Sequence, residues 1–383
     1  MGFSIRNNMK RIISLYLFIA CVVVSKGIYA SDNVVLVTLD GVRWQEVFNG
    51  ADEKLINNTD FVKNPEQLNK MFWHKEPRIR QKLLMPFITQ QVAKQGVIIG
   101  DRNNGSRMSV ANPWYFSYPG YNEILTGSVD EEINSNDKVV NPNKTILELL
   151  HHQPKYKNKT ALFGSWDVFP FIVNAKRSGV YVNAGFMPID DDLFADAALL
   201  NALQKEIPSP WHNVRLDSFT YRFAKAYMLA KKPKLLVISL GETDDFAHDG
   251  HYDHYLKSAK QSDAFIQDLW QTIQSTPGYQ NNTTLIITTD HGRGSNANDW
   301  QHHSSKQAMA QSEQGKKAFP EGIVGSEHIW LAAIGPDIKR QGLLKTTTQL
   351  KQKQIAATIL KVLGQNPYRI NPTMADAIDE VLK

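Results

Sequence analysis

Carboxylates follow three apolar runs of the 383-residue sequence, and histidines stand close behind two of them. Acidic side chains that converge at one edge of a sheet repel each other and are costly to bury unless a cation lies among them. Imidazole and carboxylate groups without sulfur suit Zn²⁺, with Mn²⁺ or another divalent ion as the alternative. The pattern therefore predicts a metal site with enough ligands for two ions. The candidate ligands are Asp40, Asp244, His248, Asp290 and His291.

Two spacings favour coordination by these side chains. Asp244 and His248 are four residues apart, so one turn of a helix would place both on the same face. Asp290 and His291 are adjacent at the expected end of a strand, where the chain turns. Asp245 is the one residue that could replace Asp244 as a ligand.

A serine could supply the nucleophile that a two-metal hydrolase needs. Ser117 stands just before a Pro-Gly turn, which leads into the apolar-periodic stretch 122–127. In that position its side chain would face a helix N-terminus, where free N–H groups favour anions such as phosphate. Contact with a metal would lower the pKa of the serine hydroxyl and make it a stronger nucleophile.

The elements that position these residues can be predicted from the apolar pattern. With 42% apolar and 21% charged residues, the composition is that of a globular protein and excludes collagen and coiled coils. Continuous apolar runs indicate strands covered on both faces, and their alternation with helices predicts a mainly parallel α/β sheet with helices on both faces. Ligands collect at the carboxyl ends of such strands. The predicted strands are 34–39, 97–100, 160–163, 235–240, 284–289 and 329–334, and the predicted helices are 144–152, 191–205, 216–231, 252–275 and 348–363.

Residues 1–30 are predicted to be a secretory signal peptide. They hold four basic residues and no acidic ones, an apolar run over 12–24, and an Ile-Tyr-Ala ending before Ser31. The apolar run is too short to span a bilayer comfortably, and no later run approaches the necessary length. We therefore expect an exported protein, periplasmic or secreted, without a transmembrane segment in its mature form. Residues 31–383 are expected to form a single domain, and the polar segments 50–95 and 292–325 are expected to be loop insertions.

The charge excess of the chain also lies in residues 1–30. The formal net charge is +5, but beyond residue 30 there are 39 Lys and Arg against 38 Asp and Glu, so no nucleic-acid partner is implied. The only cysteine is Cys21, which leaves residues 31–383 without a thiolate ligand or a thiol nucleophile. Attachment of a lipid to Cys21 is the alternative to cleavage after Ala30. The sequence does not predict an oligomeric state.

Four motifs, in order along the chain, resemble those of the alkaline phosphatase superfamily, and most closely its type I phosphodiesterase/nucleotide pyrophosphatase branch. They are Thr-Leu-Asp40-Gly-Val-Arg, Ser117-Tyr-Pro-Gly-Tyr-Asn-Glu-Ile-Leu-Thr-Gly, Asp244-x-x-x-His248 and Thr-Asp290-His291-Gly-Arg-Gly. The resemblance implies an alkaline-phosphatase-like α/β sandwich. It also implies that the partner is a small phosphoester, which is hydrolysed through a phosphoseryl intermediate at Ser117.

The resemblance further implies how two divalent metal ions are bound. One ion would be held by Asp40, Asp290 and His291, and the other by Asp244, His248 and a further histidine. The Ser117 oxygen would lie between the two ions. His303 is favoured as the further histidine, and His328 and His302 are the alternatives.

One departure from the family pattern bears on the substrate. Nucleotide pyrophosphatases usually carry an asparagine where this chain has Gly120, so the motif does not select a nucleotide. Asn122, Asn103 and Arg43 are the candidate substrate-binding residues in its place, although a salt bridge or a helix start is the favoured role of Arg43. A sulfatase of the same fold is an alternative function, but it would carry an arginine where Tyr121 stands. A binding or scaffold protein without catalysis is the remaining alternative.

Overall fold

The computed structural model describes residues 31–346 and 348–383, so the predicted signal peptide and Cys21 lie outside the described residues. Eight strands form the central sheet, in the order β10-β2-β9-β7-β1-β6-β4-β5. Their bounds are β1 Asn33–Leu39, β2 Val97–Ile99, β4 Thr160–Gly164, β5 Tyr181–Ala184, β6 Leu235–Leu240, β7 Thr283–Thr288, β9 Leu331–Ile334 and β10 Gly342–Leu343. A smaller sheet has the order β11-β3-β8, with β3 Met108–Ser109, β8 His328–Ile329 and β11 Leu350–Lys351.

The centre of the large sheet is formed by β7, β1 and β6. Every residue of these three strands is buried, which is why their sequences are runs of apolar and β-branched residues without a polar face. β1 pairs in parallel with β6 on one side and with β7 on the other, and β4 pairs in parallel with β6 and β5. The prediction of a mainly parallel α/β sheet is therefore confirmed.

One strand, β9, runs antiparallel to both of its neighbours, β7 and β2. The sequence predicted a single strand over 329–334, but the chain changes sheets at Trp330, so that β8 pairs with β3 and β9 joins the central sheet. The buried indole of Trp330 donates to the Val42 carbonyl oxygen at 2.9 Å, and the Thr288 hydroxyl donates to the carbonyl oxygen of Trp330 at 2.6 Å. These bonds fix the crossing between the two sheets.

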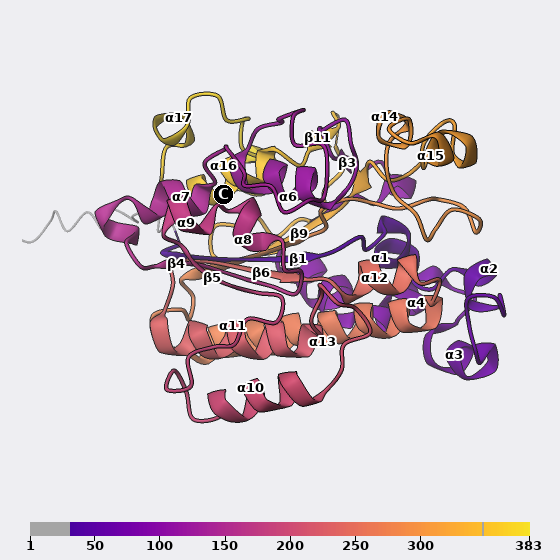
Figure 1. The fold of residues 1–383 in the computed structure, drawn as a ribbon, viewed down its shortest axis with the longest axis horizontal. Helices are drawn as coiled ribbons and strands as arrows, with labels where there is room; N and C mark the ends of the chain where they lie inside the picture. The colour runs from indigo at the N-terminus through magenta and orange to yellow at the C-terminus, as the bar shows by residue number, and fades with distance from the viewer. Residues whose placement is uncertain (1–30, 347) are drawn as a thin grey trace, which may run out of the picture.

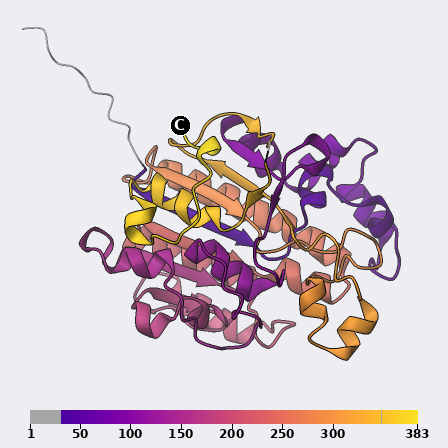
Figure 2. The same cartoon turned by 90° about the horizontal axis from the view of Figure 1, so that it is seen from above.

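Helices cover both faces of the central sheet, and each layer of helices encloses its own apolar core (Figure 1). One face carries α10 Ala197–Glu206, α11 Asp217–Lys231 and α13 Tyr252–Ser275. The other face carries α6 Ser117–Thr126, α7 Ile146–His151, α8 Phe169–Ile172 and α16 Gln354–Val362, which lie over the strands in the view from above (Figure 2). The predicted helix over 252–275 is confirmed at both ends. The predicted helix over 348–363 begins later, because Leu350 and Lys351 pair with β3 instead.

The segment 50–95 is largely helical, so the prediction of a loop insertion there is wrong. Its helices are α2 Glu53–Ile56, α3 Pro65–Phe72, α4 Pro77–Leu84, the π-helix η2 Phe87–Val92 and α5 Ala93–Gln95. The side chains of Asp52 and Asn64 cap two of them, and Pro65 and Pro77 occupy first turns, where proline is favoured. Because helices this short show little apolar periodicity, the sequence pattern did not predict them.

The other predicted insertion, 292–325, contains two short helices, α14 Lys306–Met309 and α15 Glu313–Ala318, and is otherwise irregular. The remaining helices are α1 Trp44–Asn49, η3 Arg102–Asn104, η4 Pro154–Tyr156, α9 Ala175–Ser178, α12 Glu242–His248, α17 Pro367–Ile370 and η5 Asp379–Val381. Across the part of the chain that the structure describes, no helix is both long and apolar enough to cross a bilayer.

Candidate active site

The carboxyl ends of β7, β1 and β6 lie side by side at one edge of the central sheet, because these strands are parallel neighbours. Asp40 directly follows β1, and Asp290 follows β7 after one intervening residue. Asp244 lies in the first turn of α12, which begins just after β6. The topology of the sheet therefore brings together three acidic residues that are far apart in the sequence.

Asp40, Asp290 and His291 form the first ligand group, in which one ligand atom from each residue lies within 4.8 Å of the others. His291 Nε2 lies 3.4 Å from Asp40 Oδ1 and 3.4 Å from Asp290 Oδ2. All three side chains are buried, and these two carboxylate oxygens have no hydrogen-bond partner among the described residues. Burying an oxygen without a partner is costly. A divalent cation at this point would satisfy both oxygens and the imidazole nitrogen.

Hydrogen bonds hold the remaining atoms of the first ligand group. The Nδ1 atom of His291 donates to the carbonyl oxygen of the next residue at 2.8 Å, which directs Nε2 toward the two carboxylates. The Tyr121 hydroxyl donates to Asp40 Oδ2 at 2.9 Å and accepts a hydrogen bond from Ser239 at 2.9 Å. Outer contacts of this kind orient the side chains that ligate metals. The group is therefore positioned before any ion binds.

Asp244, His248 and His303 form the second ligand group. His248 Nε2 lies 3.2 Å from Asp244 Oδ2 and 3.1 Å from His303 Nε2. Asp244 and His248 are one turn apart on α12, as their spacing predicted. His303 comes from the irregular segment 292–325, and its Nδ1 donates to the Tyr115 carbonyl oxygen at 3.2 Å, so that Nε2 faces the other two ligands.

The alternative ligands lie outside both groups. His328 is in β8, and its Nε2 lies 3.1 Å from the carboxylate of the preceding residue. The ring of His302 packs against Phe319 with the ring centroids 5.2 Å apart. Asp245 lines the cavity described below but does not join Asp244 in the second ligand group.

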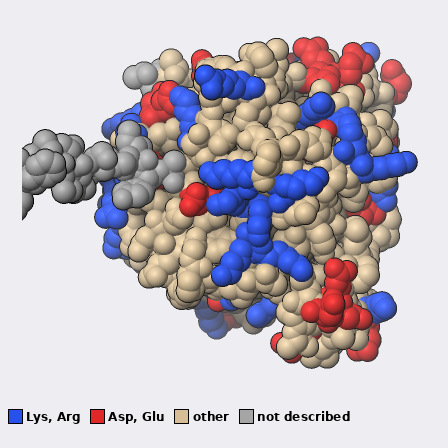
Figure 3. Space-filling view, turned by 90° about the vertical axis from the view of Figure 1, so that its left-hand side faces the viewer, with Lys and Arg blue, Asp and Glu red and all other residues tan. Residues whose placement is uncertain are grey.

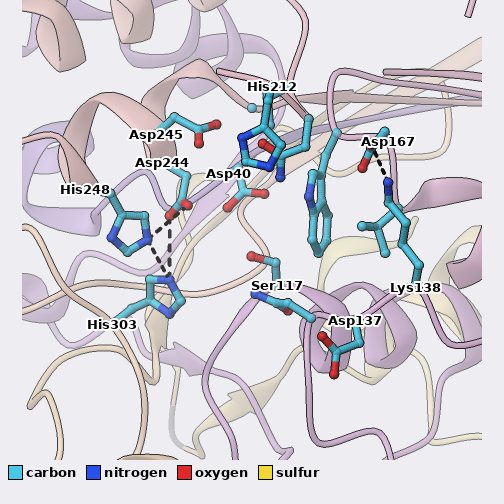
Figure 4. A pocket seen from close by; sticks show the side chains of 16 residues that line it. Asp40, Ser117, Asp137, Lys138, Asp167, His212, Asp244, Asp245, His248 and His303 are labelled. Atoms are coloured by element: carbon cyan, nitrogen blue, oxygen red, sulfur yellow. Dashed lines mark hydrogen bonds and ion pairs between the residues drawn. The ribbon is translucent and has the colours of Figure 1, made fainter. Parts of the chain in front are cut away.

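The two ligand groups adjoin each other, and Ser117 lies close to Asp40, Asp244 and His303 at the cavity wall (Figure 4). The rings of His291 and His303 stack with their centroids 3.9 Å apart, and His291 Nε2 lies 3.7 Å from Asp244 Oδ1. Ser117 Oγ lies 3.3 Å from the same Nε2 atom. Ser117 is the first residue of α6, so its hydroxyl also stands at a helix N-terminus, where anions bind favourably.

The first ligand group creates a strong negative field. Burial, together with the charges of Asp290 and Asp244, raises the pKa of Asp40 well above its usual value. Burial alone would lower the pKa of His291, but the charge of Asp290 and the interaction with Asp40 raise it to about 9. The carboxylates therefore favour a positive charge between them, whether it is a proton on His291 or a bound cation.

Two residues of the second ligand group, Asp244 and His303, are held in the protonation states that metals require. Burial would raise the pKa of Asp244, but the guanidinium of Arg293 and the imidazole of His248 hold it well below its usual value. Arg293 is itself buried and donates to the Asp244 carboxylate. Burial and the neighbouring His291 hold the pKa of His303 well below its ordinary value, so its imidazole is neutral. Ionised carboxylates and neutral imidazoles are the forms that bind metal ions.

Ser117 and the second ligand group open onto a cavity of 540 Å³. This volume falls in the range of about 300–1,000 Å³ that is typical of small-molecule sites. On the far side of the cavity, Lys138 Nζ lies 2.7 Å from the Asp167 carboxylate, and His212 stands above Ser117 (Figure 4). The other lining residues are Asp40, Asn136, Asp137, Trp166, Val168, Asn213, Val214, Gly241 and Asp245.

The candidate substrate-binding residues Arg43 and Asn122 do not line this cavity, and Arg43 instead has the salt bridge that was its favoured role. Arg43 is 1% exposed and forms an ion pair with Glu46, and its Nη1 donates to a backbone carbonyl oxygen at 2.9 Å. Asn122 is buried and accepts a hydrogen bond from Asn141 at 3.0 Å. Asn103, the third candidate, also lies away from the cavity. Both residues hold the scaffold instead, Arg43 through a buried ion pair, whose breaking typically costs about 3–5 kcal/mol, and Asn122 through its hydrogen bond with Asn141.

Gly120 allows α6 to approach the end of β7 closely. A Cβ atom at Gly120 would lie 2.5 Å from the carbonyl oxygen of Asp290, so the asparagine of the related pyrophosphatases does not fit here. Asn136, from the loop between α6 and α7, lies at the N-terminus of α6, and its Oδ1 accepts the Tyr118 N–H at 2.9 Å. This leaves the amide N–H groups of Asn136 as donors on the cavity wall. Sequence reasoning missed Asn136, because nothing in its polar surroundings marks it.

A strained turn orients His303. Tyr115 has a φ of 61°, which is uncommon for a bulky residue. The Asn112 Oδ1 atom accepts the backbone N–H groups of both Trp114 and Tyr115 at 3.0 Å, and Glu123 accepts from the Asn112 side chain at 2.9 Å. This arrangement aims the Tyr115 carbonyl oxygen at the ring of His303. The Asn-Pro-Trp sequence is typical of a turn and was the signal that could have pointed to Asn112.

The sequence profile of the type I phosphodiesterase/nucleotide pyrophosphatase family matches residues 67–354. The matched range contains Ser117 and the whole second ligand group, and it begins after Asp40. A comparison with curated protein sequences found no match.

Solved structures with a similar fold include several hydrolases. The wild-type alkaline phosphatase PafA has a TM-score of 0.57 and 11% identity, covering 92% of this chain and 99% of that chain. The phosphonate monoester hydrolase SpPMH from Silicibacter pomeroyi has a TM-score of 0.53 and 13% identity, covering 91% and 76%. A putative sulfatase from Bacteroides thetaiotaomicron also has a TM-score of 0.53 and 13% identity, covering 92% and 74%. These likenesses show that the fold is of the alkaline phosphatase type, as the sequence motifs implied.

Proposed function

Because the chain belongs to the type I phosphodiesterase/nucleotide pyrophosphatase family, we propose that it hydrolyses small phosphate esters at a two-metal site. One observation carries the proposal: Ser117 Oγ lies 3.3 Å from His291 Nε2, at the junction of the two ligand groups and on the wall of a cavity. A hydroxyl beside two carboxylate-imidazole groups is the arrangement that a two-metal hydrolase needs. The substrate is a phosphodiester or a phosphomonoester.

Each ligand group would hold one divalent cation. The donors are carboxylates and imidazoles without sulfur, which favours Zn²⁺, with Mn²⁺ as the alternative. The buried, unpaired oxygens of Asp40 and Asp290 support the first position. Bound cations would polarise the phosphoryl oxygens and lower the pKa of the Ser117 hydroxyl.

Ser117 is the proposed nucleophile. In the first step the Ser117 hydroxyl gives its proton to water, the bond between Oγ and phosphorus forms as the bond to the leaving oxygen breaks, and the departing alkoxide takes a proton from water. In the second step water attacks the phosphoserine, the bond between phosphorus and Oγ breaks, and the serine hydroxyl is restored. The N-terminus of α6 favours the negative phosphoryl group in both steps. Electrostatic stabilisation of that group is expected to be the largest catalytic contribution.

A panel of chromogenic substrates tests the proposed function. We expect the purified protein to hydrolyse bis(p-nitrophenyl) phosphate or p-nitrophenyl phosphate, to lose this activity in a chelator and to regain it with Zn²⁺ or Mn²⁺. We expect p-nitrophenyl sulfate to be a poor substrate. Preferential turnover of the sulfate would favour the sulfatase alternative. A protein with neither bound metal nor turnover would favour a scaffold.

Asn136 is the donor that we propose for a phosphoryl oxygen in place of the missing asparagine. The variant Asn136→Ala is expected to lower kcat/KM about 10²-fold while the metal content is unchanged. The variant Asn136→Asp separates two roles, because it keeps the oxygen that accepts the Tyr118 N–H but loses the donor. We expect this variant to be at least as impaired as Asn136→Ala. Near-normal steady-state kinetics for Asn136→Asp would show that the residue only supports Tyr118.

Asn112 is expected to influence the affinity of the second ligand group for its metal, because it holds the turn at Tyr115 that orients His303. Asn112→Ala removes the acceptor that holds this turn, so we expect the affinity of one metal to fall about 10–100-fold, measured by competition with a chromogenic chelator. Glycine adopts a positive φ without strain. Tyr115→Gly alone is therefore expected to keep the affinity, and the double variant Asn112→Ala/Tyr115→Gly to recover part of the loss. If the second substitution recovers nothing, the turn does not transmit the effect.

A further inference from the structure

The face of the molecule at the amino ends of the strands is strongly basic (Figure 3). Six lysines from two segments meet there: one segment runs from η4 to the start of β4, and the other runs from the end of α11 to the start of β6. We call this surface the lysine face. It consists of Lys155, Lys157, Lys159, Lys231, Lys232 and Lys234.

Hydrogen bonds to backbone carbonyl oxygens fix the two segments against each other. The Lys159 ammonium donates to the Lys231 carbonyl oxygen at 2.8 Å, and the Lys234 N–H donates to the Lys159 carbonyl oxygen at 2.7 Å. The segments then enter β4 and β6, which are paired in parallel from their first residues. The spacing of the charges is therefore set by the central sheet and not by a mobile tail.

Only part of this charge is balanced nearby. Asp32 Oδ1 lies 3.8 Å from Lys155 Nζ and 3.7 Å from Lys234 Nζ. The hydrogen bond from Asn282, followed by the charges of these lysines, holds the pKa of Asp32 below its usual value. Lys157 is exposed. Residues 31–383 have 39 basic and 38 acidic residues, so their net charge is close to zero. The lysine face therefore arises because lysines are concentrated on one side of the molecule.

We propose that the lysine face docks the protein onto an anionic lipid membrane. Lysine ammonium groups are compact point charges that suit a diffuse layer of lipid phosphates. Nucleic-acid sites usually add arginine forks and exposed aromatic rings. The lysine face has neither, because its six basic residues are all lysines and Tyr156, which stands among them, is buried.

The position of the face in the fold agrees with this role. The described chain begins at Ser31, next to Asp32, whose carboxylate contacts Lys155 and Lys234 on this face. β6 leads from Lys234 to the cavity at its other end, across six strand residues or roughly 20 Å. A molecule docked by its lysine face would therefore keep the cavity open to substrate on the side away from the membrane.

Sedimentation with lipid vesicles tests this proposal on the mature protein, which is expected to comprise residues 31–383. We expect binding to mixed phosphatidylcholine–phosphatidylglycerol vesicles at low salt, release at about 0.5 M salt, and little binding to pure phosphatidylcholine. A charge-reversal variant is expected to bind the anionic vesicles about 100-fold more weakly. It combines Lys155→Glu, Lys157→Glu, Lys231→Glu and Lys232→Glu.

A matched control carries the same change of net charge on exposed lysines of α2, α4 and α15, at the other end of the molecule (Figure 1). It combines Lys54→Glu, Lys82→Glu, Lys316→Glu and Lys317→Glu, and we expect it to keep vesicle binding. Both variants should keep the wild-type thermal midpoint and metal content. Equal losses in the two variants, equal binding to charged and neutral vesicles, or tighter binding to duplex DNA than to anionic vesicles would each overturn the proposal.

Discussion

Ser117→Ala is expected to lower turnover of the best nitrophenyl ester by about 10⁴-fold or more, a loss typical of removing a catalytic nucleophile. The reason is that the Ser117 hydroxyl is the one that stands at the junction of the two ligand groups and at the start of α6. Metal content should stay at the wild-type value, because all six carboxylate and imidazole ligands remain. Steady-state kinetics and elemental analysis on the same preparation measure both quantities.

A matched serine nearby provides the control. Ser135 lies on the loop between α6 and α7, and its side chain accepts a backbone N–H at the surface. Ser135→Ala is expected to keep wild-type turnover. If Ser117→Ala retained wild-type turnover with metal bound, another group would have to be the nucleophile, and the proposed phosphoserine would be excluded.

The second large effect is expected from Asp290→Asn. This change keeps the size of the side chain but removes a charge from the first ligand group, where Asp290 Oδ2 has no hydrogen-bond partner among the described residues. We expect the protein to lose one metal ion per chain and at least about 10³-fold in kcat/KM, since a metal ion supplies several kcal/mol of transition-state stabilisation. Elemental analysis and steady-state kinetics measure the two losses.

Asp263 serves as the control for a buried acid outside the site. It accepts the backbone N–H groups of Phe87 and Ile88 at 2.8 and 3.0 Å, and burial raises its pKa to about 7. Asp263→Asn is expected to keep the full metal content. Retention of both ions in Asp290→Asn would show that the first ligand group does not hold a metal.

The sequence predicts the centre of this fold well, because strands covered on both faces carry an unmistakable apolar signal. The predicted and observed bounds of β6 are identical, β1 begins one residue earlier than predicted, and β7 is shifted by one residue at both ends. The edge strand β5 was not predicted, because its half-exposed Tyr181 and Val182 give no continuous apolar run. The break at Trp330 was not predicted either, since both sides of the break are apolar and only tertiary contacts separate the two strands.

The residues of the two ligand groups were predicted to converge, and the structure places them together. Parallel neighbouring strands explain why Asp40 and Asp290 could be paired from their positions alone. Their roles as metal ligands, and that of Ser117 as nucleophile, stay predictions. The surrounding contacts were beyond sequence reasoning: Asn136 and Asn112 act through backbone groups that become neighbours only in the folded chain.

Arg43 shows what the sequence leaves undecided. An arginine three residues after a strand-end aspartate could bind a phosphate, but a salt bridge was its favoured role, and in the fold its guanidinium pairs with the buried Glu46. The apolar pattern of the sequence does not reveal such a buried pair. Both side chains are charged, and an Arg–Glu pair three residues apart is equally compatible with an exposed helix face. Burial of a charged pair depends on the elements that close over it, here the segment that follows His291.

The central claim is that two divalent cations lie in the two ligand groups. Anomalous X-ray diffraction from crystals of the protein grown with Zn²⁺, recorded on both sides of the zinc absorption edge, tests it most directly. The account predicts two anomalous peaks, one among Asp40, Asp290 and His291 and the other among Asp244, His248 and His303. A crystal with no peak at these side chains, or with zinc bound only elsewhere on the protein, would contradict it.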